Sequence, residues 1–119
     1  MGKKVLFAVL GLLVVAVAVW VIWSNVTVEL HRITVQSAGL PTAFDGARIA
    51  HVSDLHNASF GEDNQTLLQL LRQSQPDIIA ITGDLIDSRR TDVETAARFV
   101  EQAVQIAPVY YVTGNHEWA

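Results

Sequence analysis

The residues of this 119-residue chain that could do chemistry are carboxylate, imidazole and amide side chains that follow three apolar runs. They are Asp54 and His56 after residues 48–53, Asp84 after residues 77–83, and Asn115 and His116 after residues 108–114. Nitrogen and oxygen donors of this kind suit Zn, Fe, Mn or Ni, and the chain has no cysteine thiolate that would demand Zn. Because two carboxylates repel each other at close range, a cation is the natural way to hold Asp54 and Asp84 together.

The three apolar runs predict strands of a parallel α/β sheet whose carboxyl ends meet at one edge. The central stretch, residues 77–87, opens with a run apolar enough for a strand that is buried on both faces. Gly83 permits a sharp exit from this strand with the backbone close to a neighbour. Open α/β sheets bind ligands at the carboxyl ends of their strands. Residues two apart in an extended segment share a side, so Asp54 and His56 can face one ion.

Segments with helical spacing separate the three strands. The first has an apolar stripe that ends before Pro76, formed by Leu67, Leu68 and Leu71. The second follows a capping box at residues 91–94, and its expected buried face consists of Val93, Ala97, Val100 and Val104. The alternation of strands and helices implies a parallel sheet with right-handed crossovers. A further strand is predicted at residues 26–36, where β-branched residues are frequent.

The three polar groups are evenly spaced along the chain. Asp84 lies 30 positions after Asp54, and Asn115 lies 31 positions after Asp84, about one βα unit each. An isolated Asp-x-His or Gly-Asn-His carries little information, since an aspartate after a strand is often only a turn or cap residue. Their joint occurrence at three successive strand ends favours a shared metal site over packing alone.

The amino end of the chain predicts a membrane anchor. Residues 5–23 contain no charged side chain, and about 20 apolar residues cross a bilayer core as a helix. Trp20 and Trp23 stand at the far end of this segment, as interfacial aromatic residues do. The alternative is a cleavable signal peptide, but its apolar region is usually only ~7–15 residues long. Lys3 and Lys4 favour a cytoplasmic amino end, which predicts a single-pass protein of the cell membrane with its catalytic domain outside the cytoplasm.

These features divide the chain at residue 25. Residues 1–25 are predicted to form a cytoplasmic stub and the transmembrane anchor, and residues 26–119 to form part of an α/β domain. The formal net charge of −4 argues against a nucleic-acid partner. The partner expected from the residues alone is therefore the membrane, through residues 5–23.

Three blocks of the chain carry a family resemblance. Asp54-Leu55-His56, residues 83–87 and residues 114–117 resemble the first three signature blocks of the calcineurin-like metallophosphoesterases. The sequence around the first block, Ser53-Asp54-Leu55-His56-Asn57, follows a membrane anchor and in this respect resembles the membrane-anchored bacterial branch of the family. That branch includes enzymes close to those that hydrolyse UDP-diacylglucosamine and other envelope phosphoesters. The resemblance covers about residues 27–119. It implies a β-sandwich flanked by helices, of which this chain holds the first half.

The resemblance also implies a centre of two divalent metal ions whose identity, Mn, Fe, Zn or Ni, stays open. Asp54 and His56 would bind the first ion, Asp84 would bridge both ions, and Asn115 would bind the second. The implied substrate is a phosphomonoester, a phosphodiester or an envelope pyrophosphate, attacked by a hydroxide that the two ions activate.

The third block supplies the remaining roles that the resemblance implies. His116 would be the catalytic residue, which faces the phosphate and stabilises or protonates the leaving oxygen without binding metal. Asp87 would support His116 from behind, and Glu117 is a further candidate for such support.

Family members carry further histidines in later blocks, including Gly-His-x-His, whereas these 119 residues contain only the first three blocks. We therefore expect a fragment with an incomplete site, which binds metal weakly and hydrolyses slowly or not at all. The alternative function is a non-catalytic, membrane-tethered module that binds metal or a partner. A nucleotide-binding domain would need a Gly-rich phosphate loop, and neither Gly-x-Gly-x-x-Gly nor a Walker motif is present.

Overall fold

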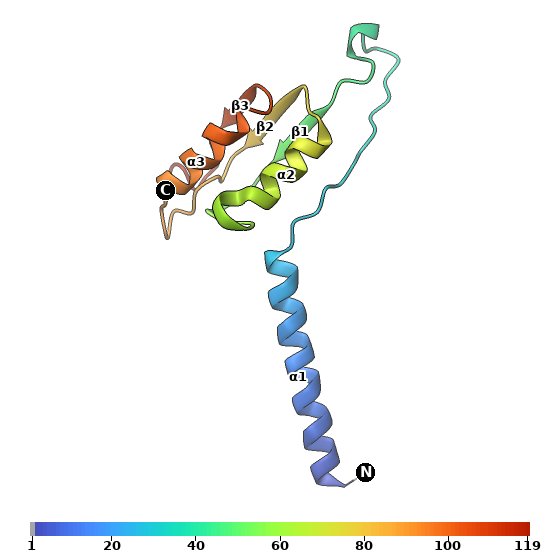
Figure 1. Ribbon diagram of the computed structural model, residues 1–119, viewed down its shortest axis with the longest axis vertical. Coiled ribbons are helices and arrows are strands. Elements are labelled where there is room, and N and C mark those ends of the chain that lie inside the picture. Colours follow the sequence, from blue (N-terminus) through green and yellow to red (C-terminus); the bar gives the residue numbers. More distant parts are fainter. Residues whose placement is uncertain (1) are drawn as a thin grey trace.

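A computed structural model describes residues 2–119 and contains a long helix, an irregular connection and a small α/β layer (Figure 1). Helix α1, Lys3–Val26, stands apart from the layer, and none of its residues is buried. One of the four carbonyls at its carboxyl end has a side-chain partner, because Thr27 Oγ1 donates to the Trp23 carbonyl at 2.7 Å. The helix is long and apolar enough to cross a membrane, a test that a signal sequence also passes.

The strand predicted at residues 26–36 is wrong. Residue 26 ends α1, and residues 27–48 contain only the 3-10 turn η1, Thr42–Phe44. β-branched residues stabilise a strand mainly by packing against a neighbouring strand. This segment pairs with no other strand in the described residues. One contact nevertheless ties the connection to the layer, because the half-buried Val28 packs against the hydrophobic core.

The predicted parallel sheet is confirmed. Its strands are β1 (Ile49–Val52), β2 (Ile78–Thr82) and β3 (Val109–Val112), hydrogen-bonded in the order β1-β2-β3. Both pairs are parallel. The connections contain the short 3-10 helix η2, Glu62–Asn64, with α2, Gln65–Ser74, and then α3, Val93–Ala103. All three carboxyl ends therefore lie at one edge of the sheet.

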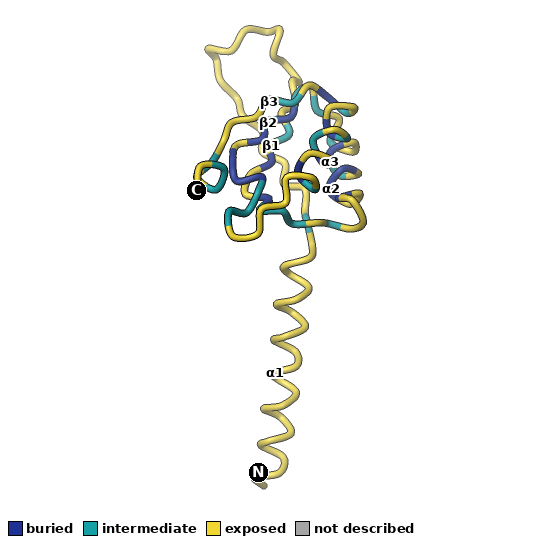
Figure 2. The backbone as a smooth tube through the Cα atoms, turned by 90° about the vertical axis from the view of Figure 1, so that its left-hand side faces the viewer, coloured by how far each residue is buried: buried dark blue, intermediate teal, exposed yellow. Residues whose placement is uncertain are grey.

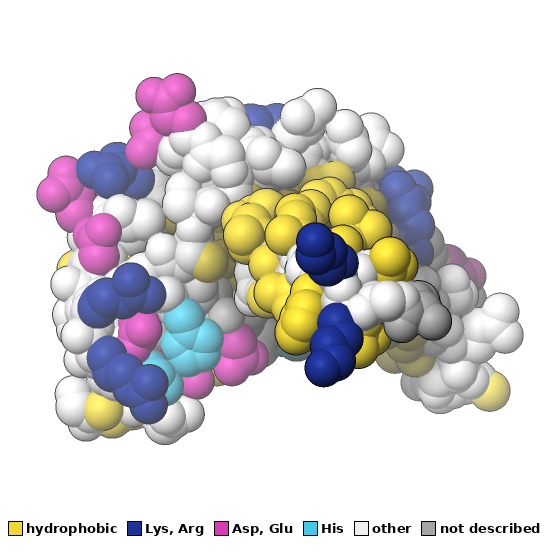
Figure 3. Space-filling view, turned by 90° about the horizontal axis from the view of Figure 1, so that it is seen from below, with side chains coloured by type: hydrophobic (Ala, Val, Ile, Leu, Met, Phe, Trp, Pro, Cys, Tyr) yellow, Lys and Arg dark blue, Asp and Glu magenta, His cyan; other side chains and the backbone are white. Residues whose placement is uncertain are grey.

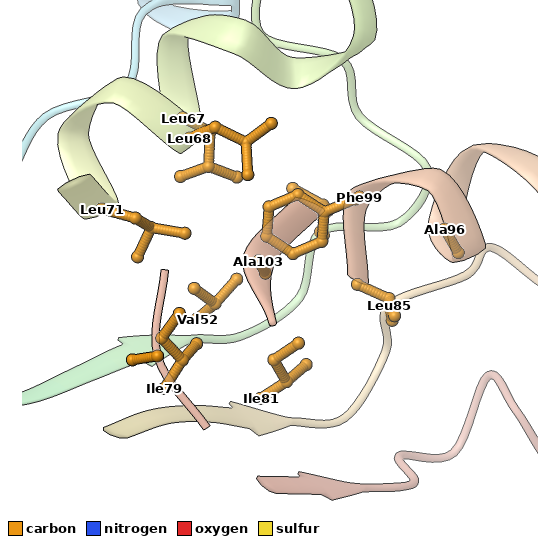
Figure 4. Close-up of a cluster of buried hydrophobic side chains, with 12 residues drawn as sticks. Val52, Leu67, Leu68, Leu71, Ile79, Ile81, Leu85, Ala96, Phe99 and Ala103 are labelled. Atoms are coloured by element: carbon orange, nitrogen blue, oxygen red, sulfur yellow. The ribbon is translucent and has the colours of Figure 1, made fainter. Parts of the chain in front are cut away.

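Helices α2 and α3 cover one face of the sheet, and the core lies between them and β2 (Figures 2 and 4). The predicted leucine stripe of α2 is buried, as are Ile79 and Ile81 of β2. The predicted face of α3 is mostly wrong. Val100 packs against the core as a half-buried side chain, but the buried residues are Ala96, Phe99 and Ala103, and Val93 is 62% exposed. Phe99 is the largest buried side chain, so it sets which face turns inward, and the two alanines allow close packing around it.

The opposite face of the sheet is uncovered within the described residues. Ile49, Tyr110 and Val112 are more than 60% exposed there, and Thr82 is exposed as well. The central strand is thus buried on one face only, and the expectation of burial on both faces is not met. A layer with one covered and one open face is compatible with the first half of the sandwich that the family resemblance implies.

Candidate functional site

The loops that follow the three strands bring the predicted polar groups together. His56, Asp84 and His116 each offer one ligand atom, and these atoms all lie within 4.8 Å of one another. His56 Nε2 stands 3.8 Å from Asp54 Oδ1 and 4.0 Å from Asp84 Oδ2. One imidazole nitrogen is therefore flanked by two carboxylates from two different loops.

This spacing fits a divalent cation. Nitrogen and oxygen ligands lie about 2.0–2.2 Å from such an ion, so two ligands of one ion are at most about 4.4 Å apart. The two distances from His56 Nε2 to Asp54 and Asp84 meet this limit. The donor set is also chemically suitable, because a cation would offset the repulsion between the carboxylates.

The loops reach this arrangement through backbone conformations that side chains usually avoid. Asp54, His56, Asn57 and Asp84 have φ angles of 53°, 47°, 60° and 50°, all in the left-handed region. The prediction that Asp54 and His56 share a side because the chain is extended there is therefore wrong, since left-handed turn conformations orient both side chains. Backbone bonds hold these turns: His56 N donates to the Asp84 carbonyl at 2.9 Å and Asn57 N to the Leu85 carbonyl at 3.1 Å.

Glycines let the loops after β2 and β3 touch. Gly83 has a φ of 94°, and a Cβ on it would lie 2.7 Å from Gly114 Cα. A Cβ on Gly114 would overlap the carboxylate and the backbone nitrogen of Asp84. Across this contact His116 N donates to Asp84 Oδ1 at 2.9 Å. The close approach that Gly83 suggested in the sequence is confirmed, and Gly114 contributes equally to it.

Glu117 binds the two loops to each other through its carboxylate. Its oxygens accept hydrogen bonds from the backbone N–H groups of four residues at 2.7–3.2 Å, namely Asp84, Leu85, Ile86 and Gly114. Burial by itself would raise the pKa of Glu117, but these four donors outweigh it and lower the pKa to about 2. The ionised carboxylate therefore acts as a cross-link beneath the cluster.

His116 is held from one side and faces His56 on the other. The backbone N–H of Ser88 donates to His116 Nδ1 at 3.2 Å, and Asp87 Oδ1 lies 3.6 Å from the same nitrogen. The neutral ring then carries its proton on Nε2. The two imidazole rings meet edge to face with centroids 4.5 Å apart. A hydrogen bond from the Arg89 N–H lowers the pKa of Asp87 against the effect of burial, and the proximity of His116 lowers it further.

Comparison with known proteins identifies the family. The family model described as "Calcineurin-like phosphoesterase" matches residues 47–119, which is more than half of the chain. The chain belongs to this family. The match includes every polar residue of the candidate site described above.

Three curated relatives of this calcineurin-like chain illustrate the range of the family. A zebrafish "transmembrane protein with metallophosphoesterase domain" is 31% identical over 66% of this chain and 18% of its own length. Two uncharacterized Bacillus subtilis metallophosphoesterases, YkuE and YkoQ, are 36% and 33% identical over 54% and 76% of this chain, and over 23% and 34% of theirs. The chain thus spans about a fifth to a third of these relatives. No solved structure matches it.

Among the predicted site residues, Asn115 is the one whose side chain is not linked to the cluster of His56, Asp84 and His116 in the described residues. Its side chain is exposed, and within residues 2–119 no hydrogen bond or ion pair links that side chain to His56 or Asp84. Its backbone is positioned, since its carbonyl accepts from Trp118 N at 3.2 Å. The other predicted residues lie at the cluster or, as Asp87 and Glu117 do, directly behind it.

The sequence alone did not point to Ser88 as part of this site, nor to a hydrogen-bonding role for Asn57 in it. Ser88 contacts His116 from a position 28 residues earlier in the chain. Asn57 Nδ2 donates to the Arg90 carbonyl at 2.5 Å, while Asn57 Oδ1 is buried without a partner in the described part of the chain. The position of Asn57 directly after Asp-x-His was the only available signal for it.

Proposed function

We propose that the chain is the amino-terminal part of a metal-dependent phosphoester hydrolase that a transmembrane helix holds on the membrane. In this proposal residues 1–25 are the stub and anchor and residues 26–119 belong to the catalytic domain. The observation that carries the proposal is the imidazole of His56 between two carboxylates, next to a second imidazole, in a chain of the calcineurin-like family.

Four residues are proposed as metal ligands. Asp54 and His56 would hold one divalent ion, Asp84 would be shared, and Asn115 would turn toward the second ion. Two bound ions would polarise the phosphoryl group and supply a hydroxide for in-line attack. The support is the pair of short distances at His56 Nε2 and the carboxylate of Asp84, which accepts from His116 N with one oxygen and keeps the other near His56.

His116 is proposed to act on the phosphate rather than on a metal ion. Because Ser88 N–H donates to Nδ1, the neutral ring carries its hydrogen on Nε2 and can donate a hydrogen bond to the leaving oxygen. Transfer of a proton to that oxygen would require a ring that is protonated on both nitrogens. Asp87, 3.6 Å from Nδ1, would stabilise the ring if it became charged. Glu117 would act indirectly by holding the loops that carry Asp84 and His116.

The proposal includes further ligands from outside residues 1–119. Two ions with at least four ligands each need more donors than this cluster contains, even when Asp84 is shared. Relatives such as the zebrafish protein are several times longer than the matched segment, which leaves room for such ligands. The 119 residues alone would then bind metal weakly and hydrolyse slowly or not at all.

Membrane attachment is proposed from α1 and from the names of two relatives. The zebrafish and cattle proteins are both called transmembrane proteins with a metallophosphoesterase domain. We propose one span through α1, with Lys3 and Lys4 in the cytoplasm and the site outside it. The narrower bacterial branch is also a proposal, because the relatives include bacterial and animal proteins.

The test is an assay with Mn²⁺ and two substrates, p-nitrophenyl phosphate and bis-p-nitrophenyl phosphate, on the chain extended by the matching remainder of its gene. His116→Ala should keep the bound Mn²⁺, measured by calorimetry, and lower the rate by about 10²–10⁴-fold. The exposed His31→Ala is the matched control and should change neither. Mn²⁺ binding by the extended chain without any hydrolysis would favour the non-catalytic binding module. Loss of bound Mn²⁺ in His116→Ala but not in His31→Ala would contradict the role given to His116.

A further inference from the structure

We infer that the candidate site faces the bilayer surface and that its substrate is a phosphoester whose lipid tail remains in that bilayer. This inference rests on the proposed function of the site as a phosphoester hydrolase. To that function the inference adds two statements: the site faces the membrane, and its substrate is therefore a lipid.

The α/β layer is held directly at the end of α1. The helix ends at Val26, and Val28 already packs against the hydrophobic core, so only Thr27 lies between them. Thr27 is itself fixed, since its Oγ1 donates to the Trp23 carbonyl at 2.7 Å. The long connection at residues 29–48 comes after this contact and does not separate the layer from the helix. Val28 is therefore the point at which the layer is attached, one residue after the end of α1.

The carboxyl edge of the sheet lies on the side of α1. The strands run from the far end of the molecule toward the helix, and η1, within residues 42–44, lies at that far end (Figures 1 and 2). A view from below, along α1 from its amino end, shows histidine side chains with acidic side chains next to them (Figure 3). The histidines of the cluster, His56 and His116, belong to this edge. A bilayer around α1 would thus lie below the site.

Aromatic residues place the level of the lipid head groups close to this edge. Trp20 and Trp23 are 64% and 60% exposed, and Trp23 stands one turn before the end of α1. Tryptophan prefers the head-group region of a membrane. The head groups would then begin within a few residues of the contact at Val28.

The same edge carries basic side chains suited to an anionic head group. Arg89 and Arg90 are exposed and follow Asp87 in the loop behind His116. Figure 3 shows Lys and Arg side chains beside the histidines on this face. Arginine near a membrane surface attracts anionic lipids over about one Debye length. This local attraction exists although the chain as a whole has a net charge of −4.

The reaction needs no further reactant. Water is split across the phosphorus–oxygen bond of the lipid phosphoester. Its oxygen bonds to phosphorus as the bond from phosphorus to the ester oxygen breaks, one of its protons ends on the leaving oxygen, and the other goes to the phosphate product or to solvent. Nε2 of His116 donates a hydrogen bond to the oxygen as it leaves. A phosphomonoester yields inorganic phosphate and a lipid alcohol, and a phosphodiester yields an alcohol and a phosphomonoester. The lipid part stays in the membrane throughout.

The direction of the site can be measured with single cysteines, because the chain contains none. We would place Arg89→Cys at the carboxyl edge and the control Ala43→Cys in η1, both exposed positions, label each with a fluorophore and reconstitute the chain in phosphatidylcholine vesicles with a head-group quencher. The molecule is 69 Å long, of which α1 accounts for about 36 Å, so the control position is well separated from the membrane. The label at position 89 should be quenched at least about threefold more strongly. Equal quenching, or stronger quenching at position 43, would overturn the inference.

The substrate class is tested with the extended chain in vesicles that contain phosphatidic acid and phosphatidylglycerol, with p-nitrophenyl phosphate as the soluble substrate. A helical (Glu-Ala-Ala-Ala-Lys)₄ insertion between Thr27 and Val28 would lift the layer by about 30 Å. It should lower hydrolysis of the lipid at least tenfold and leave hydrolysis of the soluble substrate unchanged. Hydrolysis of the soluble substrate alone, or an equal effect of the insertion on both, refutes the lipid substrate. Hydrolysis of neither refutes the proposed hydrolase instead, and the quenching result still decides which way the edge faces.

Discussion

The two edges of the sheet formed by the strand ends, the amino edge and the carboxyl edge, differ in their interactions. At the amino edge, hydrogen bonds between neighbouring segments pair the polar groups that meet there. Arg48 N donates to Asp77 Oδ2 at 2.7 Å, Asp77 N donates to the Arg48 carbonyl at 2.8 Å, and Arg48 Nη1 donates to Gln75 Oε1 at 3.1 Å. This edge closes the layer with ordinary partners, so we expect its residues to contribute to stability alone.

The carboxyl edge instead concentrates strain and negative charge. Four of its non-glycine residues are in the left-handed region, and Asp54 and Asp84 stand on either side of one imidazole. Backbone strain of this kind costs about 1–3 kcal/mol per residue and persists where function requires it. The difference indicates that the amino edge of residues 47–119 serves stability, whereas the carboxyl edge has the features expected of the ligand site that we propose.

The largest effect is expected from Gly114→Ala at the carboxyl edge. The new Cβ would overlap the Asp84 carboxylate and backbone, neither of which can move without breaking the contact between the loops. We expect a loss of about 3 kcal/mol or more in the free energy of unfolding, measured with urea in detergent micelles. Gly39→Ala is the matched control, because the nearest atom to its Cβ is 3.8 Å away. Similar losses in both variants would mean that the loop contact is not what limits this position.

Asp84→Asn should separate ligand binding from stability. The amide oxygen can still accept from His116 N, so the metal-free stability should change by less than about 1 kcal/mol. The stabilisation that Mn²⁺ gives, about 2.7 kcal/mol at a hundredfold excess over Kd, should disappear. Thermal unfolding with and without Mn²⁺ measures both quantities. An undiminished Mn²⁺ shift would exclude Asp84 as a ligand.

Glu117→Gln should loosen the carboxyl edge without removing a proposed ligand. The neutral amide loses charge-assisted bonds to four backbone N–H groups, which should cost about 2 kcal/mol in urea unfolding. The control is Glu94→Gln, whose exposed carboxylate makes one i,i+4 pair with Arg98 and should cost less than about 0.5 kcal/mol.

The pH dependence of the unfolding free energy is a second test of the role of Glu117. Because folding lowers the pKa of Glu117 from 4.5 to about 2, its contribution to stability is complete above about pH 4.5. The contribution is lost as the pH falls from there toward 2. Glu117→Gln should therefore flatten the fall of unfolding free energy within this window. An unchanged slope would show that the carboxylate is not held in its charged form.

The sequence predicted the elements whose signals are local. The apolar runs became β1, β2 and β3, and the leucine stripe became α2 because its periodicity is read within a few residues. The face of α3 was mostly wrong because the sequence of this helix offers two apolar faces at helical spacing, and Ala96, Phe99 and Ala103 form the one that is buried. Which of the two turns inward depends on how the large Phe99 side chain packs in the core, which is a tertiary contact. The strand at 26–36 failed for the same reason, because a strand requires a neighbour.

The candidate site shows the same division. The sequence could place Asp54, His56 and Asp84 at one edge, because parallel strands align their carboxyl ends. It could not foresee that left-handed turns rather than an extended chain aim them. Contacts between residues some 30 positions apart, such as Ser88 with His116, leave no periodic signal in the sequence.

The smallest effect is expected from Asp77→Asn at the amino edge, and it runs opposite to that of Asp84→Asn. The substitution weakens the acceptor of the Arg48 N–H bond without removing the oxygen, which should cost about 1 kcal/mol in urea unfolding. No part of the candidate site lies at this edge, so the stabilisation by Mn²⁺ should be unchanged. Asp92→Asn serves as the control for a change of charge alone, because asparagine caps a helix nearly as well as aspartate and Asp92 caps α3. If Asp77→Asn reduced the Mn²⁺ shift while Asp92→Asn did not, the two edges would be coupled and their proposed separation into stabilising and binding roles would fail.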